Sequence, residues 1–288
     1  MLRYTDNKPE RPTALVTGGS RGIGLELAKE FARNGHDLVL VARGKESLES
    51  VSNRLTEEYG CRVTAIPLDL TAEGASADLF RQVQEQGVRI DVLVNNAGIA
   101  DYGSFSDRDS GNLAAMLQLN IVGLSLLTRL FLPDMIERGS GRILNVASVV
   151  AFFAGAPNWA AYVASKQYVL ALTRGLRGEL RGTGVSVTAL CPGPAETGFA
   201  DLSGVGRTRA YRWLPKVHPS AVARKAYRGT MAGRCYVIPG LLNKVNAVLG
   251  ELPPRGIAQA VLSLLLSTRP ASGQQRKNCD EDTVEHHR

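Results

Sequence analysis

Short runs of aliphatic and β-branched residues alternate with longer segments of helical period along most of the chain. Seven runs are predicted to be strands, at residues 13–17, 37–42, 63–68, 90–95, 142–147, 185–190 and 235–239. Between the first two, Ile23, Leu27 and Phe31 recur every four residues and predict a helix over 23–34, ended by Gly35. Apolar strands separated by helices indicate a doubly wound α/β fold, a parallel sheet of about seven strands with helices on both faces.

The composition fits one globular domain. The chain has 288 residues, 44% hydrophobic and 21% charged, which excludes disordered, collagen-like and coiled-coil proteins. We expect a single domain over 12–268, between mobile polar tails at 1–11 and 269–288. No signal-peptide core or membrane-spanning run is expected, and the four cysteines lack metal-ligand spacing. These features predict a cytoplasmic protein without a metal ion.

A helical extension is predicted over 241–268. An apolar stripe with helical spacing is followed by two prolines and a second apolar run at 258–266; the stripe consists of Leu241, Leu242, Val245, Val248 and Leu249. Such a segment can cap an apolar tunnel, pack on another subunit or lie on a membrane surface. We favour packing within the protein or a dimer.

The turn after the first predicted strand has the sequence TGGSRGIG, at residues 17–24. Glycines allow the backbone to approach a pyrophosphate, and the helix that follows offers free N–H groups. Parallel sheets bind ligands at the carboxyl ends of their strands, where this turn lies. We therefore expect a dinucleotide to contact Gly18, Ser20, Arg21, Ile23 and Gly24.

The end of the second strand bears on the choice of dinucleotide. An acidic residue there usually binds the ribose hydroxyls of NAD(H), but this chain has Ala42 followed by Arg43. Arg43 and Arg21 supply two guanidinium groups for a 2′-phosphate, so NADP(H) is favoured over NAD(H). The alternative is that both arginines are solvated surface charges.

The ends of the third and fourth strands add further candidates. Asp69, followed by Leu70, can accept a hydrogen bond from the adenine amino group. The fourth strand ends in NNAG, at residues 95–98. Asn95 can equally serve the sheet, whereas Asn96 and Gly98 are the better candidates for cofactor contacts.

Ser148 ends the fifth strand, fourteen residues before Tyr162, and Lys166 follows four residues later. Tyr162 and Lys166 share one helix face. An ammonium group stabilises a phenolate and lowers the phenol pKa, so the pair is suited to proton transfer. Ser148 is placed to bind the same substrate oxygen. These residues are the predicted catalytic group.

With these motifs in order, together with LQLNIVG, YVASK and CPGPAET, the chain resembles the short-chain dehydrogenase/reductase family of the single-domain Rossmann type over residues 13–240. The resemblance implies that Asn120 is a fourth catalytic residue, which holds a water in a proton relay with Lys166. It also implies nicotinamide contacts from Pro192, Gly193, Ala195 and Thr197.

The implied activity is hydride transfer between NADP(H) and a carbonyl or secondary alcohol, in the direction of reduction. Alternatives are an oxidative alcohol dehydrogenase and a sensor or scaffold that binds NADP(H) without turnover. The resemblance also implies a homo-dimer or homo-tetramer, formed through the helices that carry Asn120 and Tyr162.

In this family the substrate wall follows the fifth strand and includes a lid, here at about 199–218. We expect the substrate to contact Ser148, Val150, Phe152, Tyr162 and Phe199. This apolar wall predicts a hydrophobic carbonyl substrate, and the segments NNAGIADYGSF and CYVIPGLLNKV resemble those of 3-oxoacyl thioester reductases and 17β-hydroxysteroid dehydrogenases.

The net charge of +7 is unevenly distributed. Residues 1–200 hold 20 basic and 21 acidic side chains, whereas residues 201–288 hold 14 and 6. Nine Lys and Arg and no Asp or Glu lie between Leu202 and Gly250. One hypothesis is that this stretch binds an anionic substrate handle, such as coenzyme A; the alternative is a solvated basic surface. Without basic stripes interleaved with aromatics, no nucleic-acid binding is predicted.

Overall fold

The computed structural model describes residues 11–208, 211 and 214–251. A sheet in the order β3-β2-β1-β4-β5-β6-β7 forms its centre, and all neighbouring strands are parallel. The strands are β1 (Thr13–Thr17), β2 (Asp37–Ala42), β3 (Val63–Pro67), β4 (Val92–Asn95), β5 (Gly141–Val146), β6 (Val185–Leu190) and β7 (Tyr236–Val237). The predicted fold class and the seven strands are confirmed.

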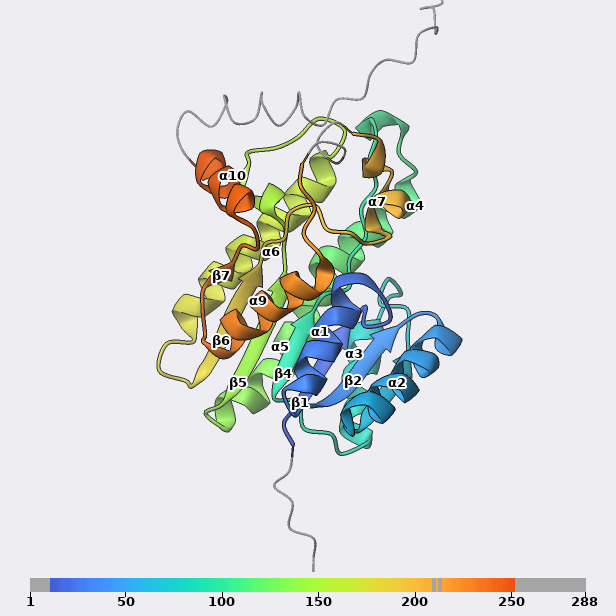
Figure 1. Ribbon diagram of the computed structural model, residues 1–288, viewed down its shortest axis with the longest axis vertical. Coiled ribbons are helices and arrows are strands. Elements are labelled where there is room, and N and C mark those ends of the chain that lie inside the picture. The colour runs from blue at the N-terminus through green and yellow to red at the C-terminus, as the bar shows by residue number, and fades with distance from the viewer. Residues whose placement is uncertain (1–10, 209–210, 212–213, 252–288) are drawn as a thin grey trace, which may run out of the picture.

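Helices cover both faces of this sheet (Figure 1). One face carries α1 (Gly22–Arg33), α2 (Lys45–Tyr59) and α9 (Pro219–Met231), and the other carries α3 (Ala75–Glu85), α5 (Leu124–Glu137) and α6 (Ala160–Glu179). The remaining helices are α4 (Ser110–Leu117), α7 (Phe199–Ser203) and α10 (Leu241–Glu251), with short helices η1 (Phe105–Asp107), η2 (Gln118–Gly123), η3 (Val149–Phe152) and η4 (Val205–Arg207).

Alternating strand residues build a separate core on each face of the sheet. In β2, Leu38 and Leu40 pack with α1 and α2, whereas Val39 and Val41 pack toward α3 and α5. A third core lies around η3, α6 and α7, next to the carboxyl ends of β5 and β6. Because this third core adjoins the edge where ligands bind in such folds, it forms the apolar walls of the site described below.

The continuous helical stretch Ser110–Glu137, made of α4, η2 and α5, bears on the expectation that no segment could span a membrane. By length and composition it is a candidate span, the single one within the described part of the chain. Its Leu127, Phe131 and Met135 are buried in the core under the sheet. That packing is what a core helix of a sheet protein shows.

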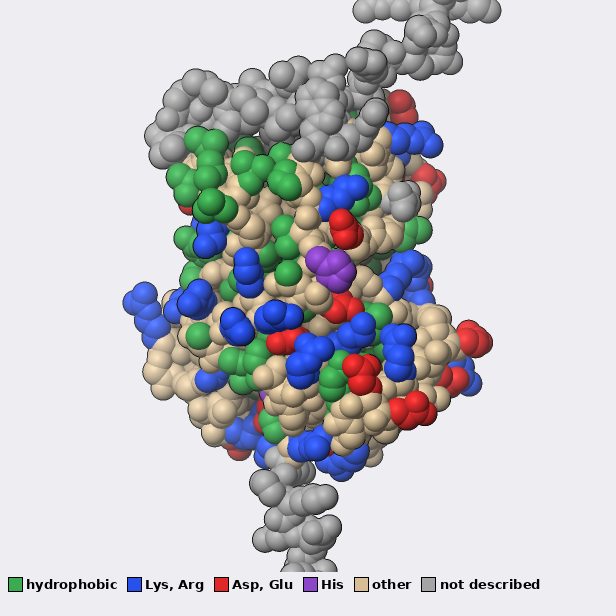
Figure 2. Space-filling model, viewed as in Figure 1, with side chains coloured by type: hydrophobic (Ala, Val, Ile, Leu, Met, Phe, Trp, Pro, Cys, Tyr) green, Lys and Arg blue, Asp and Glu red, His purple; other side chains and the backbone are tan. Residues whose placement is uncertain are grey.

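Most of the apolar stripe of helix α10 faces outward in the single chain, although Leu249 lines the cavity described below, so packing on another subunit stays a prediction. Leu241 is 79% exposed and Val248 60% exposed, whereas Asn243, Ala247 and Gly250 face inward. A Cβ at Gly250 would lie 2.7 Å from the carbonyl oxygen of Phe152, so the helix approaches that backbone too closely for a side chain at this position. Figure 2 shows the resulting hydrophobic patch over α10.

The predicted tail at 269–288, the second part of the extension at 252–268 and nearly all of the tail at 1–11 lie outside the described residues. So do positions 209, 210, 212 and 213 of the predicted lid.

His36 offers a test of how α1 packs on α9. Its ring lies edge-on to Phe31 (centroids 5.2 Å apart) and to Tyr227 (6.0 Å) and is only 3% exposed. Burial lowers the pKa of His36 from its ordinary value of 6.5, so the unfolded chain binds this proton more readily than the folded protein. Stability is therefore lost as the pH falls below about 6.5.

We expect His36→Phe to remove this acid sensitivity, because a phenyl ring keeps both edge contacts and takes up no proton. The melting temperatures of both proteins at about pH 8 and about pH 5 measure this sensitivity. The melting temperature of the parent should fall further between these two pH values than that of the variant. Equal losses would contradict the assignment.

Candidate active site

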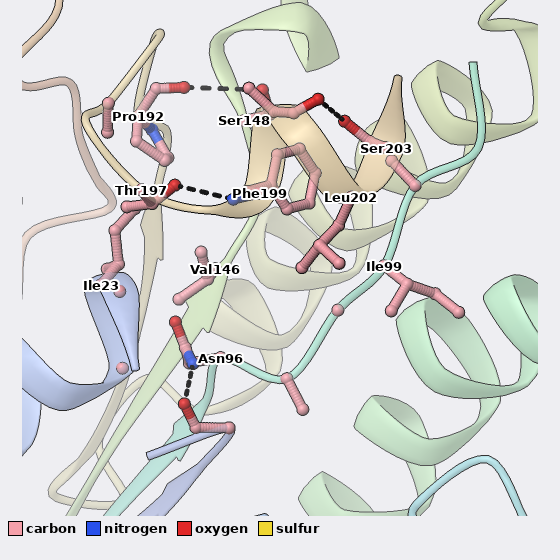
Figure 3. A pocket seen from close by; sticks show the side chains of 18 of the residues that line it. Ile23, Asn96, Ile99, Val146, Ser148, Pro192, Thr197, Phe199, Leu202 and Ser203 are labelled. Carbon is pink, nitrogen blue, oxygen red and sulfur yellow. Dashed lines mark hydrogen bonds between the residues drawn. The ribbon is translucent and has the colours of Figure 1, made fainter. Parts of the chain in front are cut away.

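One large cavity of about 1030 Å³ runs along the carboxyl ends of the strands. Every residue predicted to bind the cofactor lines it: Gly18, Ser20, Arg21, Ile23, Gly24, Arg43, Asp69, Leu70, Asn96, Gly98, Tyr162, Lys166, Pro192, Gly193, Ala195 and Thr197. Figure 3 shows how Ile23, Thr197, Asn96 and Ser148, from different turns, lie around it. The chain thus gathers turns from both halves of the sheet at one site.

The glycine-rich turn between β1 and α1 brings backbone very close to backbone. Gly18 has a φ of +66°, and a Cβ on Gly24 would overlap the carbonyl oxygen of Gly18 and the amide of Asn96. Arg21, the N-cap of α1, makes no side-chain capping bond, so the first N–H groups of the helix have no side-chain cap. Close backbone and free helix N–H groups are what a pyrophosphate requires, so the turn fits a dinucleotide.

Asn96 acts chiefly on the shape of this turn. Its side-chain nitrogen donates to the carbonyl oxygens of Thr17 (2.8 Å) and Gly18 (3.3 Å), while its backbone N–H donates to the Thr17 hydroxyl. Asn95 instead points into the core and donates to Thr128 and Asn145. Of the two roles left open for Asn95, the structure shows the one that serves the sheet.

The two arginines proposed for a 2′-phosphate both line the cavity. Arg43 lies 4.0 Å from the Asp69 carboxylate, and its side chain remains 64% exposed. Burial raises the pKa of Asp69, but hydrogen bonds from the Thr71 N–H and hydroxyl and the charge of Arg43 outweigh it and lower that pKa. The carboxylate is therefore ionised at neutral pH and available to accept from an adenine amino group.

Ser148, Tyr162 and Lys166 meet where β5 and α6 face the cavity. Lys166 donates from Nζ to the carbonyl oxygen of Val146 (2.9 Å) and lies 5.8 Å from the Tyr162 ring centroid. The Ser148 hydroxyl donates to the Pro192 carbonyl (3.5 Å) and hydrogen-bonds Tyr162. All three side chains are buried. A phenol, an ammonium group and a hydroxyl thus share one desolvated corner.

Burial dominates the titration of this corner. It raises the pKa of Tyr162 well above its usual range, although the Ser148 hydrogen bond opposes the shift, and it lowers the pKa of Lys166 to about 8. In the protein without cofactor the pKa of Tyr162 is therefore raised rather than lowered, because desolvation of the phenol dominates and Lys166 contributes no lowering. At neutral pH the phenol holds its proton and can donate it.

Asn120 lies in η2, a π-helical turn between α4 and α5, and its side chain does not line the cavity. The amide exchanges hydrogen bonds with the backbone of Ile99 (3.0 and 2.9 Å) and donates to the Ser165 hydroxyl (3.1 Å). Asn120 therefore ties the strand end after β4 to the helix of Tyr162 and Lys166. The water relay implied by the resemblance stays a prediction.

The turn after β6 is held by α10. A Cβ on Gly193 would overlap the amide of Asn243, whose nitrogen also donates to the Pro239 carbonyl (2.7 Å). The Thr197 hydroxyl accepts from the Phe199 N–H (3.4 Å), which starts α7 (Figure 3). The extension thus supports the turn predicted to contact the nicotinamide.

The substrate side of the cavity differs from the expectation at one residue. Val150 and Phe199 line it, but Phe152 does not. The Phe152 ring lies edge-on to Tyr236 (6.0 Å) and under Arg174 (5.7 Å), because the η3 turn directs it away from the cavity. Phe153 takes that place.

The lining also includes residues that the sequence did not single out as contacts, among them Trp159, Leu202 and Leu249. Trp159 precedes Tyr162 by three residues, which puts both on one helix face and is a usable signal. Leu202 and Leu249 come from α7 and α10 and carry no comparable signal.

Comparison with known proteins agrees with this geometry. Residues 12–204 match the family model described as short chain dehydrogenase. The chain is 38% identical over 181 residues to ketoacyl reductase HetN of a Nostoc species, covering 63% of this chain and 62% of that protein. It is 35% identical over 197 residues to a very-long-chain 3-oxoacyl-CoA reductase of Anas platyrhynchos, covering 66% of this chain and 62% of that protein. The chain therefore spans less than two thirds of the length of both curated relatives.

A solved structure adds coverage of nearly the whole chain. A short-chain dehydrogenase from Sphingobium yanoikuyae in complex with NADPH is 31% identical and superimposes with a TM-score of 0.74, covering 93% of this chain and 99% of that one. With the seven-stranded parallel sheet and the matched family model, these likenesses show that the chain belongs to the short-chain dehydrogenase family of oxidoreductases.

Proposed function

We propose that the protein reduces the carbonyl group of a hydrophobic substrate with NADPH. The observation that carries this proposal is the buried group of Ser148, Tyr162 and Lys166, which faces a largely apolar cavity that also takes in Arg21 and Arg43. The cofactor, when bound, supplies the hydride.

The chain's own residues handle the oxygen and the proton. The Ser148 hydroxyl orients the carbonyl oxygen, and Tyr162 donates its proton as that oxygen gains negative charge. Burial raises the pKa of the phenol, which therefore stays protonated until the substrate oxygen becomes negatively charged. Lys166, held by the Val146 carbonyl, places its ammonium group beside the phenol and stabilises the phenolate left behind.

Cofactor choice rests on Arg21 and Arg43. We expect the double variant Arg21→Ala, Arg43→Ala to raise the KM for NADPH by about 100-fold, because charge-assisted bonds to a phosphate are lost, and to change the KM for NADH by less than about 3-fold. Steady-state kinetics with both cofactors measure this.

Arg33→Ala is the matched control, since Arg33 pairs with Glu30 (2.7 Å) and lies outside the cavity lining. Equal losses for NADPH and NADH would refute the assignment of the arginines.

We propose 3-oxoacyl thioesters as the substrate class. The apolar cavity and the likeness to two oxoacyl reductases support this choice. Oxidation of NADPH followed against 3-oxoacyl thioesters, steroids and simple ketones tests it. No turnover of any of these would favour a protein that binds the cofactor without reaction, and turnover only of the alcohols with NADP+ would favour the oxidative dehydrogenase.

An anionic handle on the substrate fits the basic lid. Arg207 is exposed in η4, and Lys216 lies over the ring of Tyr211 (4.6 Å), which lines the cavity. Arg209 and Arg212 lie outside the described residues. A coenzyme A thioester should therefore show a lower KM than the N-acetylcysteamine thioester of the same acyl chain, and added salt should reduce the difference.

We also propose a homo-oligomer built through α4, α5 and α6. Exposed apolar side chains on these helices and on η2 between α4 and α5 support it, namely Leu117, Val122, Leu126, Ile136 and Tyr168. Light scattering after size exclusion measures the mass in solution.

A further inference from the structure

The phenol of Tyr162 lies between two aromatic side chains. The indole of Trp159 is stacked on it, with ring centroids 4.6 Å apart and planes 22° from parallel. Phe199 makes a second, tilted contact at 5.9 Å and 48°. Both partners line the cavity, and Trp159 is only 8% exposed. The plane of the Tyr162 ring is therefore set by contacts outside its own backbone.

The indole is itself held by packing and by the backbone. The Tyr102 ring lies edge-on to the indole, with ring centroids 6.4 Å apart. The ring nitrogen of Trp159 has no hydrogen-bond partner in the described part of the chain. The preceding residue, Asn158, has a φ of +60°, which no other non-glycine residue among those described adopts. Its carbonyl oxygen accepts from the Gly103 N–H at 2.8 Å. Strained backbone conformations persist only where surrounding contacts enforce them, so the orientation of Trp159 is built in.

The stack also covers part of the phenol ring. Trp159 is the N-cap residue of α6, three residues before Tyr162, and its ring covers one face of the phenol ring. Phe199 contacts the ring from α7. With these partners in place Tyr162 is only 6% exposed, although a large cavity lies beside it.

We propose that Trp159 is a positioning residue for Tyr162, which fixes the phenol ring plane so that the hydroxyl meets the substrate oxygen and which keeps water from the hydroxyl. This role rests on the proposed function of Tyr162 as proton donor and goes beyond it, because Trp159 acts through the phenol. Trp159 needs no hydrogen bond for this role, consistent with an indole N–H that has no partner among the described residues.

Two substitutions distinguish the effect of ring stacking from the effect of side-chain size. Trp159→Phe keeps a ring on which the phenol can stack, whereas Trp159→Leu keeps an apolar side chain without one. In the full chain with NADPH and a ketone substrate, we expect Trp159→Leu to lower kcat by about 100-fold, as small misplacements of reacting groups do, and Trp159→Phe to lower it by less than about 5-fold. The Kd for NADPH should stay within about 2-fold for both, since Trp159 is not among the residues assigned to the cofactor.

Phe153→Leu is the matched control. Phe153 also lines the cavity and is buried to a similar degree, but it makes no ring contact with Tyr162 in the described structure. We expect it to change the KM for the ketone more than kcat. Equal loss of kcat in Trp159→Phe and Trp159→Leu, or an unchanged kcat in Trp159→Leu, would overturn the proposal.

A readout independent of turnover keeps this inference separate from the proposed function. An ultraviolet difference titration of each protein against its Tyr162→Phe counterpart isolates the ionisation of this phenol. We expect Trp159→Ala to move that titration toward lower pH, because water reaches the hydroxyl, and Trp159→Phe to move it less. If no ketone is reduced by the parent, the proposed function fails, whereas an unshifted titration in Trp159→Ala contradicts the role of Trp159.

Discussion

Tyr162→Phe is expected to lower the turnover of any ketone substrate by about 1,000-fold or more, because proton donation to the developing oxyanion is lost. The change removes only a hydroxyl, since the phenyl ring keeps its contacts with Trp159 and Phe199. The Kd for NADPH should therefore stay near the parent value. Turnover is measured by NADPH oxidation under saturating substrate, and binding by the fluorescence of NADPH.

Tyr168→Phe is the control on the same helix. Its hydroxyl shares a hydrogen bond with Ser125 (3.0 Å) and its side chain is 40% exposed, away from the cavity lining. This variant should keep parent activity. Substantial turnover by Tyr162→Phe would show that another group donates the proton.

Gly24→Ala is expected to weaken NADPH binding by about 100-fold or more, because a misplaced backbone at a pyrophosphate loses several hydrogen bonds together. The added methyl group would overlap the Gly18 carbonyl and the Asn96 amide. The Gly18 carbonyl belongs to the main chain and cannot turn aside as a side chain can, so β1 and α1 must move apart. Fluorescence titration with NADPH measures the loss, and thermal unfolding without cofactor measures the cost to the fold.

Gly175→Ala provides the comparison, since a Cβ there meets nothing within 4 Å and lies on the helix α6. Alanine favours a helix over glycine by about 1 kcal/mol, so this variant should bind NADPH normally and unfold no earlier than the parent. Normal NADPH binding by Gly24→Ala would exclude the turn as the pyrophosphate site.

The cofactor half of the site could be predicted because its signals are local. A strand, a glycine-rich turn and a helix follow one another at residues 13–33, and the parallel order of the sheet brings the later turns to the same edge. The position of Asp69 and Gly98 at this edge can then be predicted without any knowledge of side-chain packing. The predicted strands agree with the observed ones to within two residues at most ends for the same reason.

The substrate half could not be predicted to the same depth. Helical periodicity shows that α10 has an apolar side but not which side faces the protein, and the backbone of Phe152 leaves room there only for Gly250. The tight turn η3 decides that Phe153 rather than Phe152 reaches the cavity, and neighbouring aromatic residues give no sign of it. The raised pKa of Tyr162 likewise depends on burial that only the folded chain reveals.

The match to the family model ends at residue 204, whereas residues that line the cavity continue as far as Leu249. Residues assigned to the cofactor and to proton donation lie within the matched part, whereas Val205, Tyr211, Leu214, Asn246 and Leu249 lie beyond it. Part of the cavity wall is thus encoded after the stretch that carries the proposed chemistry, whereas Val150, Phe153 and Phe199 on the substrate side lie within that stretch. Changes confined to the residues after 204 can therefore alter part of the cavity wall and leave the residues proposed for the reaction unchanged. Exchange of segments after residue 204 is thus a direct way to alter substrate preference.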